Sequence, residues 1–199
     1  MGLHALEEVK AGRMRWEEWL PDGVHPQFRG SFSYGTAVTT WLAQALATDL
    51  PALPVGAALP APLDAGHWGD AYALPFEQIT TTGPWHVRRW PSLKWLDQVL
   101  ETAAPGAGLR FEFDGRGVTL GFDFGRNASE FRWRIDGGDW QISNRDRPDW
   151  AGPEGWYRLS TLADDLPAGH HTCELEVIHG NAANCSGTTC RLGLVGVIV

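Results

Sequence analysis

The sequence predicts a mainly β protein, a jelly-roll-like antiparallel β-sandwich that is preceded by a short helical segment. The first observation is that the spacing of apolar residues changes after about residue 105 from helical to alternating. The second is that the alternating segments are short and separated by glycine-rich turns, a pattern typical of antiparallel sandwiches. The 199 residues, of which 43% are hydrophobic and 20% charged, suffice for a folded core and argue against disorder.

The N-terminal part has the periodicity of helices. Apolar side chains recur at near-helical spacing over residues 3–20, interrupted by one glycine, and predict two short helices. A loop over residues 21–26 ends the second helix. A further apolar stripe predicts one amphipathic helix over about 33–47, with Ser31 or Ser33 available as its N-cap.

A change of composition separates this part from the rest. Residues 51–82 are rich in proline and alanine in their first half and carry few charges, which is typical of an extended linker. We therefore expect a helical segment over 1–50, a linker over 51–82 and a β-sandwich over 83–199.

The sandwich region contains recognisable strands and turns. Residues 109–113 and 118–124 alternate around a Gly-Arg-Gly turn and predict a hairpin. Residues 130–136 and 140–142 flank the sequence Asp-Gly-Gly-Asp, a type I′ turn signal that predicts a second hairpin. Further strands are expected at 156–160, 171–178 and 191–199.

Charge and hydropathy exclude several classes of function. With 16 basic and 24 acidic residues the net charge is −8, which disfavours a protein that follows nucleic-acid phosphates. No apolar run approaches the roughly 18 residues of a membrane-spanning helix. The first residues lack the features of a secretory signal, so localisation stays open, with a secreted or periplasmic parent protein as one alternative. The charge favours neutral substrates or polymers.

Three cysteines lie late in the chain. Cys185 and Cys190 enclose a four-residue loop that a disulfide could close, which would leave Cys173 unpaired. Three reduced thiols are the equal alternative. The C-x4-C spacing has no second pair of metal ligands, so neither a metal nor a cofactor is expected.

The sharpest local motif is Asp22-Gly23-Val24-His25-Pro26. Gly23 permits a tight turn, Pro26 holds the preceding residue extended, and the spacing can bring the Asp22 carboxylate to the His25 ring. A carboxylate that accepts from one imidazole nitrogen leaves the other nitrogen free to take a proton from a hydroxyl nucleophile. The motif therefore has the composition of the base half of a catalytic triad.

The residues around this motif resemble a known family. The stretch 19–34, with its lead-in over 7–16, closely resembles the last conserved block of the SGNH (GDSL-type) hydrolases. The resemblance implies that Asp22 is the orienting acid and His25 the general base of a Ser-His-Asp triad. It also implies that residues 1–50 are a helical remnant of an α/β SGNH domain, in which the last helix packs on the sheet.

The downstream part resembles the β-sandwich appended to some bacterial two-domain SGNH carbohydrate esterases. The matching marks are Phe111-x-Phe113-x-Gly115, Arg134-Ile135-Asp136-Gly137-Gly138-x-Trp140 and Leu166-x-x-Gly169-x-His171-Thr172. The resemblance covers most of this chain but only part of the family's catalytic domain. It implies deacylation of acylated sugars.

One departure from the family decides the expected mechanism. The Gly-Asp-Ser block with the nucleophile is absent, as are the Gly and Asn blocks that supply the oxyanion hole. Ser31 and Ser33 are expected to cap a helix rather than to replace the nucleophile. We therefore expect a truncated esterase, or a shortened protein that kept the sandwich and changed its function.

Two other functions remain open. A glycan-binding module would use Trp140, Trp150 and Trp156, which lie at turns and loop edges where a ring can stack on a sugar. A glycoside hydrolase would need two carboxyl groups, and Glu154, between two tryptophans, is the first candidate. The expected partner is thus a carbohydrate or an acylated carbohydrate, with neither nucleic acid nor membrane.

The N-terminal helix also bears on assembly. Without its α/β sheet, the apolar face over 34–42 must be buried elsewhere, on the sandwich or on another copy of the chain. We therefore expect a homo-oligomer, a dimer or larger.

Overall fold

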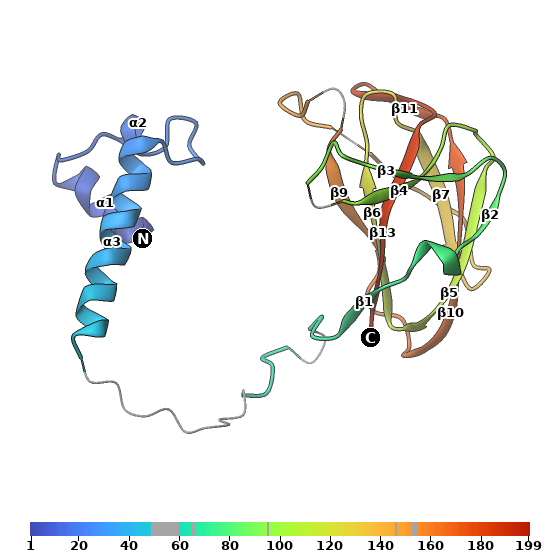
Figure 1. Cartoon of the computed structure of the whole chain (residues 1–199), viewed down its shortest axis with the longest axis horizontal. Coiled ribbons are helices and arrows are strands. Elements are labelled where there is room, and N and C mark those ends of the chain that lie inside the picture. Colours follow the sequence, from blue (N-terminus) through green and yellow to red (C-terminus); the bar gives the residue numbers. More distant parts are fainter. Residues whose placement is uncertain (49–59, 65–66, 95, 146, 153–154) are drawn as a thin grey trace. The chain divides into compact units, whose positions relative to one another are not determined.

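The computed structural model describes residues 1–48, 60–64, 67–94, 96–145, 147–152 and 155–199. The chain divides into two compact units, Met1–Ala61 and Pro62–Val199, called here the helical unit and the sandwich unit. Figure 1 shows the helices of the first unit and the strands of the second.

The helical unit has a small core of its own. It contains α1 (Gly2–Lys10), α2 (Trp16–Trp19) and α3 (Phe28–Leu46). Ala5, Met14 and Trp19 are buried, and the Trp19 indole N–H donates to the Tyr34 hydroxyl at 3.0 Å. The two short helices expected before residue 20 are confirmed.

The long helix begins five residues earlier than expected. Its N-cap is Gln27, whose backbone is extended, so the prediction that Ser31 or Ser33 caps the helix is wrong. Both serines lie within α3, because the helix starts at Phe28, two residues after Pro26, where the extended loop ends. Several large apolar side chains of α3 are exposed, namely Phe28, Phe32, Val38, Trp41, Leu42 and Leu46.

The sandwich unit consists of two main antiparallel sheets. The strands are β1 (Ala71–Ala73), β2 (Thr80–Thr82), β3 (His86–Arg89), β4 (Gln98–Thr102), β5 (Gly108–Gly115), β6 (Gly117–Asp123), β7 (Glu130–Ile135), β8 (Gln141–Ile142), β9 (Tyr157–Ala163), β10 (Gly169–Ile178), β11 (Gly180–Ala182), β12 (Cys185–Gly187) and β13 (Cys190–Ile198). The β13 sheet has the order β3-β4-β13-β6-β9, with β1 also paired to β13. The β10 sheet has the order β2-β5-β10-β7-β8, and β11 pairs with β12. A mainly β fold with a small helical part is thus confirmed.

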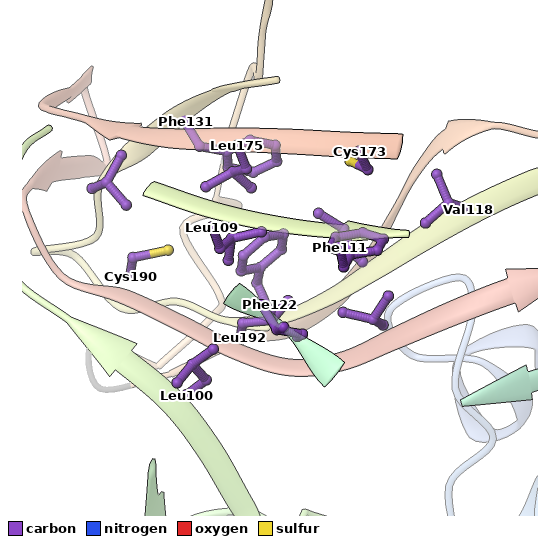
Figure 2. Close-up of a cluster of buried hydrophobic side chains, with 14 of the residues drawn as sticks. Leu100, Leu109, Phe111, Val118, Phe122, Phe131, Cys173, Leu175, Cys190 and Leu192 are labelled. Atoms are coloured by element: carbon purple, nitrogen blue, oxygen red, sulfur yellow. The ribbon is translucent and has the colours of Figure 1, made fainter. Parts of the chain in front are cut away.

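The core lies between the two main sheets. Phe111 and Leu175 come from the β10 sheet, and Phe122 and Leu192 from the β13 sheet, and each is at most 2% exposed. Figure 2 shows these side chains pointing toward one another from their strands. Phe122 also stacks on Phe131, with ring centroids 4.9 Å apart. Burying the apolar faces of both sheets against each other is what stabilises a sandwich.

The hairpin expected around Gly115 and Gly117 is wrong. β5 pairs with β2 and β10, whereas β6 pairs with β9 and β13, so the chain crosses from one sheet to the other at Arg116. The crossing is tight, because a Cβ at Gly117 would lie 2.7 Å from the carbonyl oxygen of Ala163. Alternation and a glycine turn predict two strands, but they do not determine that the strands pair.

The second expected hairpin is confirmed. β7 and β8 pair with Arg132 opposite Ile142, and the turn residues Asp136 and Gly137 have φ of 52° and 70°. The Gly138 N–H donates to the carbonyl oxygen of Ile135 at 3.0 Å and closes the turn. Positive φ at two central residues is the signature of a type I′ turn.

The predicted linker over 51–82 extends too far at its C-terminal end. Its last part contains β1, the 3-10 helix η1 (Phe76–Gln78) and β2, and the sandwich unit begins at Pro62. β1 and β2 are three residues long and pair with the long strands β13 and β5, which are distant in sequence. Strands of this kind carry almost no local periodicity, so composition alone does not reveal them.

The remaining expectations concern thiols, metals and membranes. Cys173, Cys185 and Cys190 are all free and buried, which is the reduced alternative. No cluster of three metal-ligating His, Cys, Asp or Glu side chains occurs in the described ranges. Among the described helices, none combines the length and apolarity that crossing a membrane requires.

Candidate active site

The loop between α2 and α3 carries the Asp22–His25 motif. Its ends are held together because the Gln27 N–H donates to the carbonyl oxygen of Trp19 at 3.2 Å. Gly23 has a φ of +79°, and its N–H donates to the carbonyl oxygen of Leu20 at 3.0 Å. A glycine at this position permits the turn at little steric cost. The buried Trp19 thus anchors a tight loop at its base.

The carboxylate of Asp22 organises this loop. Its Oδ1 accepts from the backbone N–H groups of Val24 at 2.9 Å and His25 at 2.7 Å. Its Oδ2 lies 2.7 Å from Nδ1 of the His25 ring. The His25 backbone N–H, the His25 ring and the Val24 N–H, in this order, hold the pKa of Asp22 well below its ordinary value. Asp22 is therefore a carboxylate at neutral pH.

This geometry fixes the tautomer of His25. An ionised carboxylate accepts a hydrogen bond from Nδ1–H, which leaves the lone pair of Nε2 available as a base. The side chains of His25 and Asp22 are 78% and 55% exposed, so the base faces solvent in this chain. The structure therefore brings the two predicted residues together in the relation that a general base requires.

Neither neighbouring serine completes the triad. The Ser31 hydroxyl donates to the carbonyl oxygen of Pro26 at 3.5 Å, and the Ser33 hydroxyl is buried without a hydrogen-bond partner in the part of the chain that the structure describes. Within the ranges that the structure describes, no serine hydroxyl hydrogen-bonds to His25.

Two of the three predicted tryptophans lie together. Trp150 and Trp156 meet edge to face with centroids 5.9 Å apart, and Trp150 is 74% exposed. Trp156 is half-buried against Phe124, and the Arg158 guanidinium lies 3.8 Å from the centroid of its ring. An exposed ring, Trp150, that packs on a half-buried ring, Trp156, is an arrangement that suits stacking on a sugar.

Trp140 belongs to a different part of the sandwich unit. It follows the β7–β8 turn, and its ring lies against Arg132 and Arg134, whose guanidinium carbons are 4.7 Å and 4.6 Å from its centroid. These arginines pair with Glu176 and Glu174 of β10. Trp140 thus packs on a ladder of ion pairs of the β10 sheet. Trp156, against which Trp150 packs, instead contacts Phe124, which follows β6, and Arg158 of β9.

The carboxylates of the sandwich are mostly engaged. Glu130 accepts from the Ser143 hydroxyl and from the backbone N–H of Arg145, and Asp136 pairs with His171 at 2.6 Å. Glu154, the alternative catalytic carboxylate, lies outside the described residues.

Asp123 is a buried carboxylate that sequence analysis did not single out. It is 1% exposed, and its Oδ2 accepts from the Trp90 indole N–H at 2.5 Å, while Oδ1 has no hydrogen-bond partner among the described residues. Burial raises its pKa, and the Trp90 N–H and Arg191 oppose the shift. Its position at the end of a fully buried strand is the sequence signal that could have identified it. It lies beneath the Trp156 segment and has no exposed surface for catalysis.

No family model and no curated protein sequence matches the chain. A solved two-domain esterase (CEX) active on acetylated mannans, co-crystallized with mannopentaose, matches at a TM-score of 0.75 and 16% identity over 97% of this chain and 52% of that chain. A second structure of a two-domain esterase (CEX) active on acetylated mannans matches at a TM-score of 0.75 and 15% identity, over 97% of this chain and 53% of that chain.

A family two carbohydrate esterase from Cellvibrio japonicus gives a TM-score of 0.46 and 16% identity, over 64% of this chain and 32% of that chain. The chain spans about half the length of the two-domain esterases that it matches. The likeness defines a class of fold, a β-sandwich with a small helical part, that this chain shares with the two-domain esterases.

Proposed function

We propose that the chain is the part of a carbohydrate-active SGNH-type esterase that carries the general base. The observation that supports this most directly is the 2.7 Å contact between Asp22 Oδ2 and His25 Nδ1, in a loop fixed by the other oxygen of the same carboxylate. The fold it shares with the two-domain esterases adds weight to the proposal. The serine nucleophile is supplied by a segment outside these 199 residues.

The proposed chemistry is acyl transfer from a sugar ester. Nε2 of His25 takes the proton of the serine hydroxyl as its oxygen attacks the ester carbonyl. Asp22, ionised because of its low pKa, stabilises the imidazolium that forms. The imidazolium then gives its proton to the sugar oxygen as the bond between that oxygen and the acyl carbon breaks, so the sugar leaves with a free hydroxyl group. Water then takes the place of the sugar and releases the acyl group from the serine by the same steps.

The exposed apolar face of α3 supports the proposal that an α/β sheet packs on this helix in the whole enzyme. Phe28, Phe32 and Trp41 are 82%, 69% and 64% exposed, although each is large and apolar. In the proposed enzyme the α/β sheet that carries the serine covers these side chains. In the 199-residue chain alone, the same face favours self-association, which sedimentation velocity would detect as a dimer or larger species.

The test of this proposal is ester hydrolysis. The 199-residue chain alone should not hydrolyse 4-nitrophenyl acetate or acetylated mannan above the buffer rate. The natural chain that joins these residues to a Gly-Asp-Ser segment should hydrolyse both, and His25→Ala should lower kcat by about 10³-fold or more. His179→Ala, an exposed histidine in the sandwich unit, is the matched control and should keep full activity. Undiminished activity of His25→Ala, or a natural chain without a nucleophile segment, overturns the proposal.

A second candidate function is glycan binding by the sandwich unit. The 74% exposure of Trp150 beside Trp156 specifically favours it. Trp150→Ala should weaken mannopentaose binding measured by calorimetry, whereas Trp68→Ala, an exposed tryptophan of the same unit, should not. Equal affinity of wild type and Trp150→Ala would exclude Trp150 from binding.

A further inference from the structure

A cavity of about 360 Å³ lies on the β13 sheet, at Gly193. Gly193 follows Leu192, whose side chain is completely buried in the core. The volume falls at the lower end of the range of about 300–1,000 Å³ that is usual for small-ligand sites. Its main lining residues are Phe76, Leu96, Asp97, Gln98, Tyr157 and Gly193.

An irregularity in β13 forms the floor of this cavity. The pairing of β13 with β6 shifts register between Leu192 and Leu194, so Gly193 lies in a β-bulge. A Cβ at position 193 would lie 2.9 Å from Leu96 Cδ1 and 3.4 Å from Tyr157 Cε2. The absence of a side chain at Gly193 therefore keeps the space between Leu96 and Tyr157 open.

Tyr157 forms one wall of the cavity. Its ring reaches from β9 over Gly121 of the neighbouring strand β6, where any Cβ would overlap the hydroxyl group. Within the described part of the chain, this hydroxyl has no hydrogen-bond partner. Gly193 of β13 and Gly121 of β6 thus make room for the ring of Tyr157. The hydroxyl group of this ring is available to hydrogen-bond to a ligand.

The chemistry of the lining suits a neutral sugar. Phe76 and Tyr157 supply aromatic surface for the C–H groups of a pyranose ring. Asp97, Gln98 and the Tyr157 hydroxyl supply a carboxylate, an amide and a hydroxyl that can hydrogen-bond to sugar hydroxyls. The Asp97 charge and the net charge of −8 disfavour an anionic ligand.

We infer that this cavity is a sugar-binding subsite that takes one unit of a neutral glycan. The ligand class rests on the proposed function, whereas the position rests on the bulge at Gly193 and the ring of Tyr157. The subsite is separate from the Trp150–Trp156 pair, because neither tryptophan lines the cavity. It would hold the glycan on the sandwich unit independently of ester cleavage.

The test is a titration of the isotope-labelled 199-residue chain with mannopentaose, followed by amide chemical shifts, with Kd measured by calorimetry. Shifts should concentrate at Gln98, Gly193 and Leu194. Gly193→Ala should weaken binding about tenfold or more, since its methyl group enters the cavity. Tyr157→Phe, which removes only the hydroxyl, should weaken it severalfold.

Two matched variants serve as controls. Gly196→Ala lies on the same strand, and its Cβ would be 3.7 Å from the nearest heavy atom, so it should bind as the wild type does. Tyr72→Phe removes an exposed tyrosine hydroxyl outside the cavity and should also leave binding unchanged. If Gly193→Ala does not fold, Tyr157→Phe still decides the question.

The outcomes are distinguishable from those of the esterase test. No binding of mannopentaose, wild-type affinity of Tyr157→Phe, or shifts confined to Trp150 and Trp156 would overturn the subsite. The titration involves no ester hydrolysis, so its failure does not touch the role of His25. Conversely, binding that depends on Tyr157 stands even if His25→Ala keeps esterase activity.

Discussion

Gly30 of α3 packs directly against Trp19 of α2. A Cβ at position 30 would lie 2.7 Å from the Trp19 carbonyl oxygen and 2.8 Å from its Cδ1. The same carbonyl oxygen accepts the Gln27 N–H that closes the loop carrying His25. The close approach of the two helices therefore sets the position of the candidate base.

Gly30→Ala should destabilise the helical unit. The added methyl group meets backbone, which cannot move aside, so we expect a loss of about 1–3 kcal/mol in the free energy of unfolding. Gly35→Ala is the matched control, because no atom lies within 4 Å of its Cβ and alanine favours a helix by about 0.5–1 kcal/mol. Urea unfolding followed by helical circular dichroism measures both. Equal stability of the two variants would show that Trp19 does not restrict Gly30.

Asp22→Ala should increase the mobility of the loop over residues 21–26. The backbone N–H groups of Val24 and His25 lose their shared acceptor, so their amide hydrogens should exchange faster with solvent. Asp22→Asn keeps an oxygen at this position and should preserve much of the protection. Hydrogen exchange measured by NMR tests this, and unchanged protection in Asp22→Ala would contradict the assigned role of the carboxylate.

What the sequence predicted correctly was determined by local chemistry. The turn at Asp136–Gly137 needs positive φ at both residues, a requirement that these residue types meet in any context. The contact of Asp22 with His25 likewise depends on a five-residue segment, 22–26, with a glycine and a proline. Such features arise from neighbours in sequence and can be recognised without knowing the fold.

What the sequence did not predict depends on distant partners. β5 and β6 look like a hairpin, but β10 and β13 compete for them and place them in different sheets. The cavity at Gly193 needs Tyr157 from β9 and Phe76 from η1, which no local pattern relates. A glycine inside a predicted strand was the signal present, since such a glycine often marks a bulge.

The three cysteines should react slowly in the native protein. Burial raises the pKa of Cys173 to about 12, and burial also raises the pKa of Cys185 and of Cys190. Titration with Ellman's reagent at pH 8 should find no rapidly reacting thiol in the native state and three thiols in guanidinium chloride. A single thiol after unfolding without reductant would instead reveal a disulfide.

His171 should make the stability of the sandwich unit depend on pH. Its Nδ1 lies 2.6 Å from Asp136 Oδ2 and its Nε2 lies 2.8 Å from the Pro167 carbonyl oxygen, so both nitrogens face acceptors. These two bonds, that to Asp136 first, raise the pKa of His171 above its ordinary 6.5. The folded state therefore holds this proton more tightly than the unfolded state does. The resulting stabilisation of the folded state is complete below pH 6.5 and is lost as the pH rises through the raised pKa of His171.

Urea unfolding of wild type and His171→Gln between pH 6 and pH 9 tests this expectation. The wild-type midpoint should fall with rising pH, and the fall should be smaller in His171→Gln, which has no titrating ring at this position. His179→Gln, whose native ring contacts Asn181, is the control and should follow the wild-type profile. Below pH 4 the sign reverses, because the Thr172 N–H and then His171 lower the pKa of Asp136, whose stabilisation disappears on protonation. Parallel pH profiles for wild type and His171→Gln would contradict a protonated His171 in the folded sandwich.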